Sequence, residues 1–366
     1  MRLLSINVLQ EGMIVGRSIW NEAGHPLLQK GVVISEGIIR RLHQLNIQYI
    51  YIEDKLSEGI EIAEHITPVE RNKAVKTITE SFKSLKTGDA KKASYILDQQ
   101  SKILMNIVED LLNSILDSEE MLTVLTDVFL CDEYLYQHSF QVAMYSIAIA
   151  KEMGYCYDDL RLIGIGAMLH DVGKIVVPKD ILLKPGRLTN EEFEIMKQHT
   201  RFGFDILRNL HSISLIVAHC AFQHHERIDG SGYPRGLIDF EIHPFAKIIG
   251  VADVFDAVTS DRVYRCKMLP SEGIEILEAG SGSIYSEAVV QALKRAVVQY
   301  PNGTTVKLVD GRRGIVSKQN PKNAERPFLR IFEENNVIVP VTYEINLAEE
   351  ILEIEKIETD YVVSSE

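Results

Sequence analysis

The strongest constraint in this sequence is a long helical stretch between residues 119 and 300. Apolar residues recur there at the three- and four-residue steps of amphipathic helices almost throughout. Two loop-rich segments, 177–187 and 229–236, interrupt the pattern. Thr189 followed by Glu192 forms a capping-box pattern, which opens a helix after the first loop. The stretch therefore predicts a domain built from helices.

The segments on either side have a different character. Residues 1–65 combine short apolar runs with punctuating glycines, which predicts a small mixed or β-rich domain. Residues 66–118 carry apolar residues at helical spacing and predict an amphipathic helical linker. Residues 301–366 show two hairpin patterns, with turns at 310–311 and 334–336, and predict a small β-rich C-terminal subdomain. The predicted fold class is mainly α, with β-rich parts at both ends.

The linker at 66–118 contains two apolar stripes. Their members are Val75, Ile78, Phe82 and Leu85 in the first, and Leu97, Leu104, Val108, Leu111 and Ile115 in the second. One interpretation is that these faces pack on the neighbouring helical domain. The alternative is a homodimer seam or a signal-transmitting segment formed by the helices of residues 70–115.

Charge and cysteine content exclude several classes of protein. Lys and Arg number 39 against 52 Asp and Glu, so the net charge is −13. This balance argues against binding polymeric nucleic acid and against a polybasic membrane anchor. No window approaches the ~18 uncharged apolar residues of a membrane span, and the N-terminus is a poor signal peptide. The four cysteines lie far apart, which argues against a disulfide framework or thiolate zinc site. A cytoplasmic location is expected by default.

Several predicted helices carry histidine or aspartate on their apolar face. The residues are His138, His170, Asp171, His199, His224, His225 and Asp253. A single histidine in such a position is usually an ordinary core residue, whereas an unpaired buried carboxylate is costly and needs a cation or hydrogen-bond donors. Seven such residues from separate helical segments predict one metal cluster.

The ligand types indicate the chemistry of this cluster. Imidazole and carboxylate without thiolate favour iron, manganese or zinc over a structural zinc site. Seven ligands suit two ions, and adjacent His170 and Asp171 allow the carboxylate to bridge them. Two ions about 3.5–4 Å apart activate a bridging water for in-line displacement at phosphorus. The residues therefore predict a binuclear phosphohydrolase.

Three cations accompany the cluster in the sequence. Lys174 follows Asp171 by three residues, and Arg262 and Arg265 follow the last ligand candidate. Cations beside a metal site can hold a phosphate and offset developing charge. The alternative is that these are surface cations paired with Asp256 or Asp261.

Three motifs then resemble one known family. They are HDVGK at 170–174, HHERIDGSGYP at 224–234 and ADVFDAVTSDR at 252–262. In this order they resemble the HD-GYP family, bacterial phosphodiesterases of cyclic di-GMP within the HD superfamily of metal-dependent phosphohydrolases. The resemblance covers residues 119–300.

The resemblance implies an all-helical HD-type catalytic domain and roles for named residues. By motif position, the family's metal ligands match His138, His170, Asp171, His199, His224, His225 and Asp253. Asp171 and Lys174 match catalytic positions, and Lys174, Arg262 and Arg265 match phosphate-contacting cations. Tyr233 would line the substrate or partner surface. The expected cofactors are two divalent ions, iron or manganese, with zinc, nickel or magnesium replacing them in preparations.

Two positions depart from the family pattern. Trinuclear members have a glutamate where this chain has Tyr134, so a binuclear site is expected. Val263 stands where the family commonly has proline, which alters loop rigidity rather than chemistry.

The implied activity is hydrolysis of cyclic di-GMP to pGpG, and on to GMP, by a metal-bridging hydroxide. Two alternatives remain open. In the first, the substrate is another cyclic dinucleotide or nucleotide. In the second, the chain is a non-catalytic signalling adaptor that binds cyclic di-GMP. The Gly-Tyr-Pro loop is also an expected docking site for a signalling protein.

Overall fold

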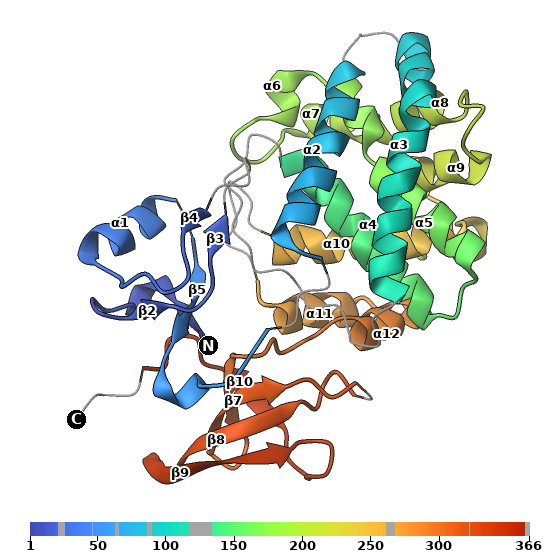
Figure 1. The fold of residues 1–366 in the computed structure, drawn as a ribbon. Coiled ribbons are helices and arrows are strands. Elements are labelled where there is room, and N and C mark those ends of the chain that lie inside the picture. Colours follow the sequence, from blue (N-terminus) through green and yellow to red (C-terminus); the bar gives the residue numbers. More distant parts are fainter. Residues whose placement is uncertain are drawn as a thin grey trace. The chain divides into compact units, whose positions relative to one another are not determined.

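The structure is a computed structural model of the chain. It describes residues 1–20, 26–45, 47–62, 66–85, 90–116, 134–260, 268–321 and 323–362. Internal contacts divide these residues into two compact units. The helical unit gathers the described residues of 65–122 and 132–296, and the β-rich unit gathers those of 1–64 and 297–366 (Figure 1).

The helical unit holds the candidate site. Its α-helices are α2 (Pro68–Ser84), α3 (Ala90–Leu116), α4 (Tyr134–Glu152), α5 (Tyr157–Leu169), α6 (Lys179–Leu182), α7 (Asn190–Lys197), α8 (His199–Leu207), α9 (Leu215–Gln223), α10 (Pro244–Thr259), α11 (Pro270–Ala279) and α12 (Glu287–Ala296). The predicted capping box between Thr189 and Glu192 opens α7. The prediction of a mainly helical domain is confirmed.

Helix α4 lies at the centre of this unit. Its residues from 138 to 150 are all buried, which is the pattern of a helix surrounded by other helices. It packs against α5, α10 and α12. The rings of Tyr145 on α4 and Phe255 on α10 meet edge to face, with centroids 5.1 Å apart. These two core helices carry His138 and Asp253, so the packed core sets the distance between two predicted ligands.

Helices α2 and α3 confirm the predicted helical pair. Phe82 of α2 is fully buried, and its ring meets that of Tyr136 on α4 at 5.5 Å. On α3, Leu104 and Val108 are buried where α3 packs against α4, α5 and α8. The stripes thus pack within the helical unit, as the first interpretation expected, and a homodimer through these helices stays a prediction.

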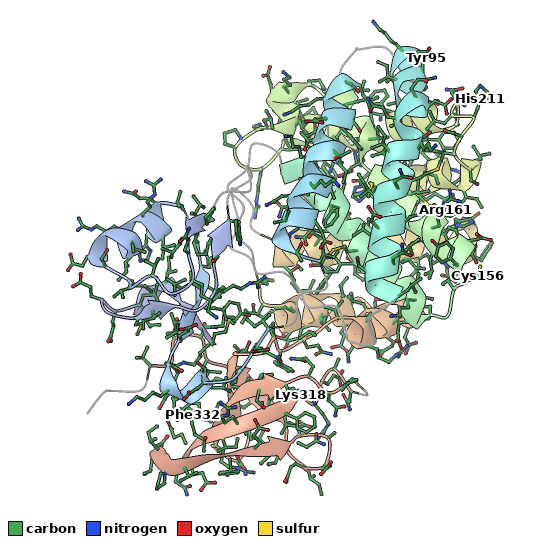
Figure 2. The ribbon with its side chains drawn as sticks, in the orientation of Figure 1. Tyr95, Cys156, Arg161, His211, Lys318 and Phe332 are labelled. Atoms are coloured by element: carbon green, nitrogen blue, oxygen red, sulfur yellow. The ribbon has the colours of Figure 1, made fainter. Side chains whose placement is uncertain are left out.

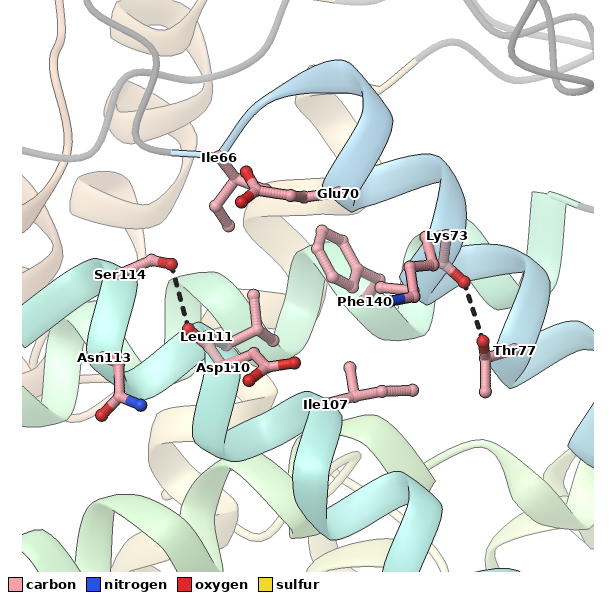
Figure 3. A pocket seen from close by; sticks show the side chains of 11 residues that line it. Ile66, Glu70, Lys73, Thr77, Ile107, Asp110, Leu111, Asn113, Ser114 and Phe140 are labelled. Carbon is pink, nitrogen blue, oxygen red and sulfur yellow. Dashed lines mark hydrogen bonds between the residues drawn. The ribbon is translucent and has the colours of Figure 1, made fainter.

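A cavity of about 420 Å³ lies between α2 and α3 (Figure 3). Phe140 of α4 lines it together with Ile107 and Leu111 of α3. Glu70 and Lys73 of α2 contribute its polar lining. No residue of the predicted metal cluster lines this cavity. It is therefore separate from the candidate site.

The β-rich unit contains three antiparallel sheets. Its elements are β1 (Arg2–Ser5), β2 (Ile14–Val15), β3 (Ile19–Trp20), β4 (Pro26–Leu28), α1 (Glu36–Gln44), β5 (Tyr49–Glu53), β6 (Thr305–Leu308), β7 (Arg313–Lys318), β8 (Phe328–Glu334), β9 (Val337–Asn346) and β10 (Ile354–Ile357). The sheet orders are β1-β5-β2, β3-β4 and β10-β6-β7-β8-β9. The two predicted hairpins are confirmed as β6-β7 and β8-β9.

The two ends of the chain pack together in this unit. The amide of Leu3 donates to the carbonyl of Gly303 at 2.9 Å, and Arg330 donates to the carbonyl of Glu58 at 2.6 Å. Phe332 of β8 (labelled in Figure 2) is buried with Ile60 in one apolar cluster. The terminal segments, predicted as two subdomains, are thus parts of one unit, and the boundaries of the four predicted segments stay predictions. None of the helices in the described ranges is long and apolar enough to cross a membrane.

Candidate metal centre

The seven predicted ligands converge in the interior of the helical unit. His138 lies on α4, His170 caps the C-terminus of α5 and Asp171 follows it. The other four are His199 at the start of α8, His224 and His225 after α9, and Asp253 on α10. Their side chains form two groups, His138 with His170 and Asp171, and His199 with His224 and His225. Within each group the ligand atoms lie within 4.8 Å of one another.

Three of the histidines are held by the same local contact. Nδ1 of His170 lies 2.6 Å from the carbonyl oxygen of Ala167, three residues earlier. His199 and His224 make the equivalent contacts, at 2.7 and 3.0 Å. A carbonyl oxygen only accepts, so Nδ1 donates in each case and Nε2 is left as a lone pair. In its neutral form, each of the three rings therefore presents the lone pair of Nε2 to the cluster.

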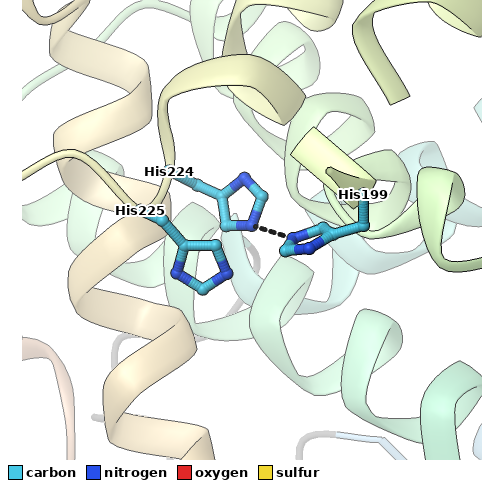
Figure 4. A group of neighbouring side chains, drawn as sticks. All are labelled: His199, His224 and His225. Carbon is cyan, nitrogen blue, oxygen red and sulfur yellow. Dashed lines mark hydrogen bonds between the residues drawn. The ribbon is translucent and has the colours of Figure 1, made fainter. Parts of the chain in front are cut away.

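Among the residues that the structure describes, no hydrogen-bond donor reaches these lone pairs. Nε2 of His199 and Nε2 of His224 face each other at 3.4 Å (Figure 4). With both Nδ1 atoms protonated, neither Nε2 can donate to the other. Nε2 of His170 is buried and has no hydrogen-bond partner among the described residues. Buried acceptors that face one another require a cation between them.

Asp171 joins the two groups through a single carboxylate. Its Oδ1 lies 3.4 Å from Nε2 of His199 and 3.9 Å from Nε2 of His224. Its Oδ2 lies 3.4 Å from Nε2 of His170 and 3.6 Å from Nε2 of His138. Oδ1 is buried without a hydrogen-bond partner in the described part of the chain. Each oxygen thus faces one group of histidines.

The charge states agree with this arrangement. Burial alone would raise the pKa of Asp171, but Lys174 and the neighbouring histidines hold it well below its usual range. Burial lowers the pKa of His199 to about 4 and that of His224 well below the ordinary value. The ionised carboxylate of Asp171 therefore faces the neutral imidazoles of His199 and His224, which is the protonation state that divalent metals bind.

His138 has a different environment. Its Nε2 lies 3.1 Å from Oδ1 of Asp253, and its Nδ1 lies 2.6 Å from Oδ2 of Asp256. Burial lowers the pKa of His138, but the hydrogen bonds to these two carboxylates outweigh it and raise the pKa to about 9. Asp256 also accepts from the hydroxyl of Ser260 at 2.8 Å. This carboxylate fixes the orientation of the His138 ring from outside the cluster.

The position of Asp256 corrects the sequence interpretation. One alternative in the sequence analysis treated Asp256 as a partner of the surface cations Arg262 and Arg265. The structure instead buries Asp256 completely, and its carboxylate contacts His138. Asp256 follows Asp253 by three residues on α10, which places both side chains on the same face of the helix. This spacing is the sequence signal from which its role could have been predicted.

Replacing Asp256 by Asn is expected to lower metal affinity about 10–100-fold, because His138 loses the charged group that orients it. Competition with a chelator, followed by elemental analysis of the protein, measures this affinity. Glu275→Gln is the matched control, since Glu275 is exposed on α11. Equal metal retention in Asp256→Asn and the wild type would contradict the role given to Asp256.

Lys174 and Tyr233 lie beside the cluster. Lys174 is in the short 3-10 turn Val172–Val176, and its Nζ forms an ion pair with Oδ2 of Asp171. The ring of Tyr233 stacks on His225 with centroids 4.6 Å apart. Burial, with the charges of Asp253 and Asp171, raises the pKa of Tyr233, so this tyrosine is neutral. The predicted contacts of Arg262 and Arg265, and the Val263 departure, lie outside the described residues.

The loop that carries Tyr233 is held by a residue that sequence reasoning missed. The buried carboxylate of Glu226 accepts from the amides of Arg235 at 2.8 Å and Leu237 at 2.9 Å. Gly232 allows this loop to close, because a Cβ there would lie 2.4 Å from the amide nitrogen of Arg227. Glu226 directly follows the histidine pair, and that adjacency was the available signal.

The donor set fits divalent metal ions. It offers imidazole nitrogens and carboxylate oxygens without thiolates, and two of these buried atoms have no hydrogen-bond partner among the described residues. Proteins with two ions bridged by a carboxylate commonly act on phosphate esters. The fold and the site therefore define the class of metal-dependent phosphohydrolases.

Comparisons with known proteins show a family match and several similar enzymes. Residues 124–289 match the HD domain family. A cyclic di-GMP phosphodiesterase of Pseudomonas aeruginosa is 28% identical over 94% of this chain and 88% of its own length. A cyclic di-GMP phosphodiesterase of Thermotoga maritima is 42% identical over 62% of this chain and 60% of its own length. A 3'3'-cGAMP-specific phosphodiesterase of Vibrio cholerae is 35% identical over 47% of this chain and 37% of its own length.

The chain matches the HD domain family over residues 124–289, and its resemblance to the HD-GYP phosphodiesterases is confirmed. The predicted fold class and the predicted enzyme class, a phosphodiesterase, are confirmed as well.

Proposed function

We propose that this chain hydrolyses cyclic di-GMP to linear pGpG with two divalent metal ions. The observation that carries the proposal is the Asp171 carboxylate, whose oxygens face separate groups of histidines. The names of the Pseudomonas and Thermotoga relatives support cyclic di-GMP as the substrate.

Each group of side chains would hold one ion. His199, His224, His225 and Oδ1 of Asp171 would hold the first. His138, His170, Asp253 and Oδ2 of Asp171 would hold the second. Ions bound there would stabilise negative charge on the phosphoryl group and acidify the attacking water. Iron and manganese suit this mixture of imidazole and carboxylate.

The remaining side chains prepare the site for an anionic substrate. Lys174 is about one-fifth exposed, so its ammonium can bind a phosphate oxygen while its stem stays packed. It also offsets charge that develops on the phosphoryl group. Asp256 holds the His138 ring through Nδ1, which leaves Nε2 directed at the two ligand carboxylates. Arg262 and Arg265 remain predicted phosphate contacts.

The test is an anaerobic assay of the full chain loaded with manganese or with ferrous iron. Incubation with cyclic di-GMP and separation of nucleotides by chromatography should show pGpG, and the time course shows whether GMP follows. Chelator-treated protein is the control. Absence of turnover with both metals would overturn the proposal.

A second candidate substrate comes from the Vibrio cholerae relative, whose name specifies 3'3'-cGAMP. A panel of cyclic di-GMP, 3'3'-cGAMP and cyclic di-AMP separates the candidates by relative kcat/KM. A faster reaction with 3'3'-cGAMP would assign the second substrate. Bound metal and tight cyclic di-GMP binding with no turnover of any member would favour the adaptor alternative.

A further inference from the structure

An exposed aromatic corner adjoins the histidine group of the candidate centre. Phe193 and Lys197 come from α7, and Tyr233 comes from the loop after α9; we call these three residues the ledge. The rings of Phe193 and Tyr233 meet nearly at right angles, 82°, with centroids 6.0 Å apart. Nζ of Lys197 lies 5.4 Å from the centre of the Phe193 ring and 5.8 Å from that of Tyr233. The ammonium of Lys197 thus lies within cation–π distance of both aromatic rings.

The ledge is continuous with the candidate metal ligands. Tyr233 stacks on His225, with an interplanar angle of 29°. Its ring centroid also lies 6.4 Å from that of His199. Tyr233 thus contacts two candidate metal ligands directly, so a phosphate held at the centre would have the ledge beside it. The parts of a substrate attached to that phosphate meet these residues next.

Phe193 leaves its ring available to a ligand. It is 45% exposed, although it lies against the half-buried Tyr233. A single exposed phenylalanine is ordinary on a protein surface. An exposed ring with a cation beside it at the edge of a phosphate-binding site is the arrangement that binds nucleobases, which stack on aromatic faces.

Lys197 gives this surface a preference for hydrogen-bond acceptors. Its ammonium pairs at 2.5 Å with Glu194, whose side chain is 66% exposed, so the ion pair faces water and can exchange partners. A lysine ammonium only donates. Guanine offers it two acceptors on one edge, O6 and N7, whereas adenine replaces O6 with an amino donor.

We propose that the ledge binds a guanine base of the substrate, with Phe193 stacking on the base and Lys197 donating to O6 and N7. The inference rests on the proposed function, because it assigns a base-binding position to the same site. Phe193 and Lys197 then determine specificity, whereas the metal ligands determine the reaction.

Two measurements test the ledge with the full chain loaded with manganese. In the first, isothermal titration gives the affinities for GMP and AMP. The wild type should prefer GMP, Phe193→Ala should bind GMP about tenfold more weakly, and Lys197→Gln should narrow the preference for GMP over AMP. The matched control is Ile195→Ala, an exposed residue of the same helix.

In the second, kcat/KM for cyclic di-GMP is compared with that for bis(p-nitrophenyl) phosphate, which carries no nucleobase. The ratio should fall about tenfold in Phe193→Ala and stay at the wild-type value in Ile195→Ala. Wild-type affinity for GMP in Phe193→Ala, or no preference for GMP in the wild type, would overturn the ledge. A wild type that prefers GMP through Phe193 but does not cleave cyclic di-GMP would overturn only the proposed function.

Discussion

Replacing Asp171 by Asn is expected to abolish hydrolysis of cyclic di-GMP and to remove bound metal. The substitution keeps the size of the side chain but removes the negative charge of the carboxylate whose two oxygens face the two sets of histidines. It also leaves Lys174 without its partner. Metal ions contribute several kcal/mol of transition-state stabilisation, so the rate should fall by about 10³-fold or more. Elemental analysis and the nucleotide assay measure the two effects together.

The control for this substitution is Asp180→Asn, which removes an exposed carboxylate on the short helix α6 of the same unit. It should retain the metal content and the rate of the wild type. Asp171→Asn protein that is folded by circular dichroism, keeps two ions and turns over cyclic di-GMP would contradict the bridging role. Loss of metal in Asp180→Asn as well would show that the assay reports a general effect of lost charge.

The convergence of the ligands could be predicted from the sequence because helices repeat regularly. A histidine on the same helix face as buried apolar residues points into the core. The shared stripe of His138, Val142 and Tyr145 therefore predicted that His138 points into the core. The hairpins were equally predictable, because their turn residues follow local rules. Asn335 and Asn336 both have positive φ, which is the conformation of a type I′ hairpin turn.

Supporting residues were less accessible to sequence reasoning. Glu226 accepts hydrogen bonds from backbone amides nine and eleven residues further along the chain. Almost every residue has a backbone amide, so the sequence does not show which amides a carboxylate will bind. Asp256 was visible as a carboxylate, but its partner His138 is 118 residues away. The exposure of Phe193 depends on the packing of α7, which periodicity does not determine. Long-range contacts of single side chains set these features, so the structure was needed to find them.

The packing of the two chain ends illustrates the same difficulty at a larger scale. The strands of each end could be recognised by alternation and turns, since both signals are local. Their association depends on contacts such as that between Leu3 and Gly303, three hundred residues apart along the chain. No local pattern encodes such a pairing, and two separate subdomains were the natural expectation.

Gly173→Ala should have the second largest effect, acting through packing rather than through chemistry. A Cβ at this position would lie 1.9 Å from the carbonyl oxygen of His199 and 2.5 Å from the amide nitrogen of Gly203. Both are backbone atoms, so the turn that carries Asp171 and Lys174 must separate from α8.

The expected result is loss of metal binding together with lower stability. Overpacking in a core costs about 1–3 kcal/mol and occasionally more, which corresponds to a melting temperature lower by about 2–12 °C in a unit of this size. Calorimetry and elemental analysis measure the two quantities. Gly37→Ala is the control, because a Cβ there meets only the Ser35 hydroxyl at 3.7 Å. Since α8 begins at His199, a movement of the turn away from α8 separates Asp171 from His199, which faces its Oδ1. A Gly173→Ala protein with wild-type stability and two bound ions would therefore show that the contact between this turn and α8 does not position the site.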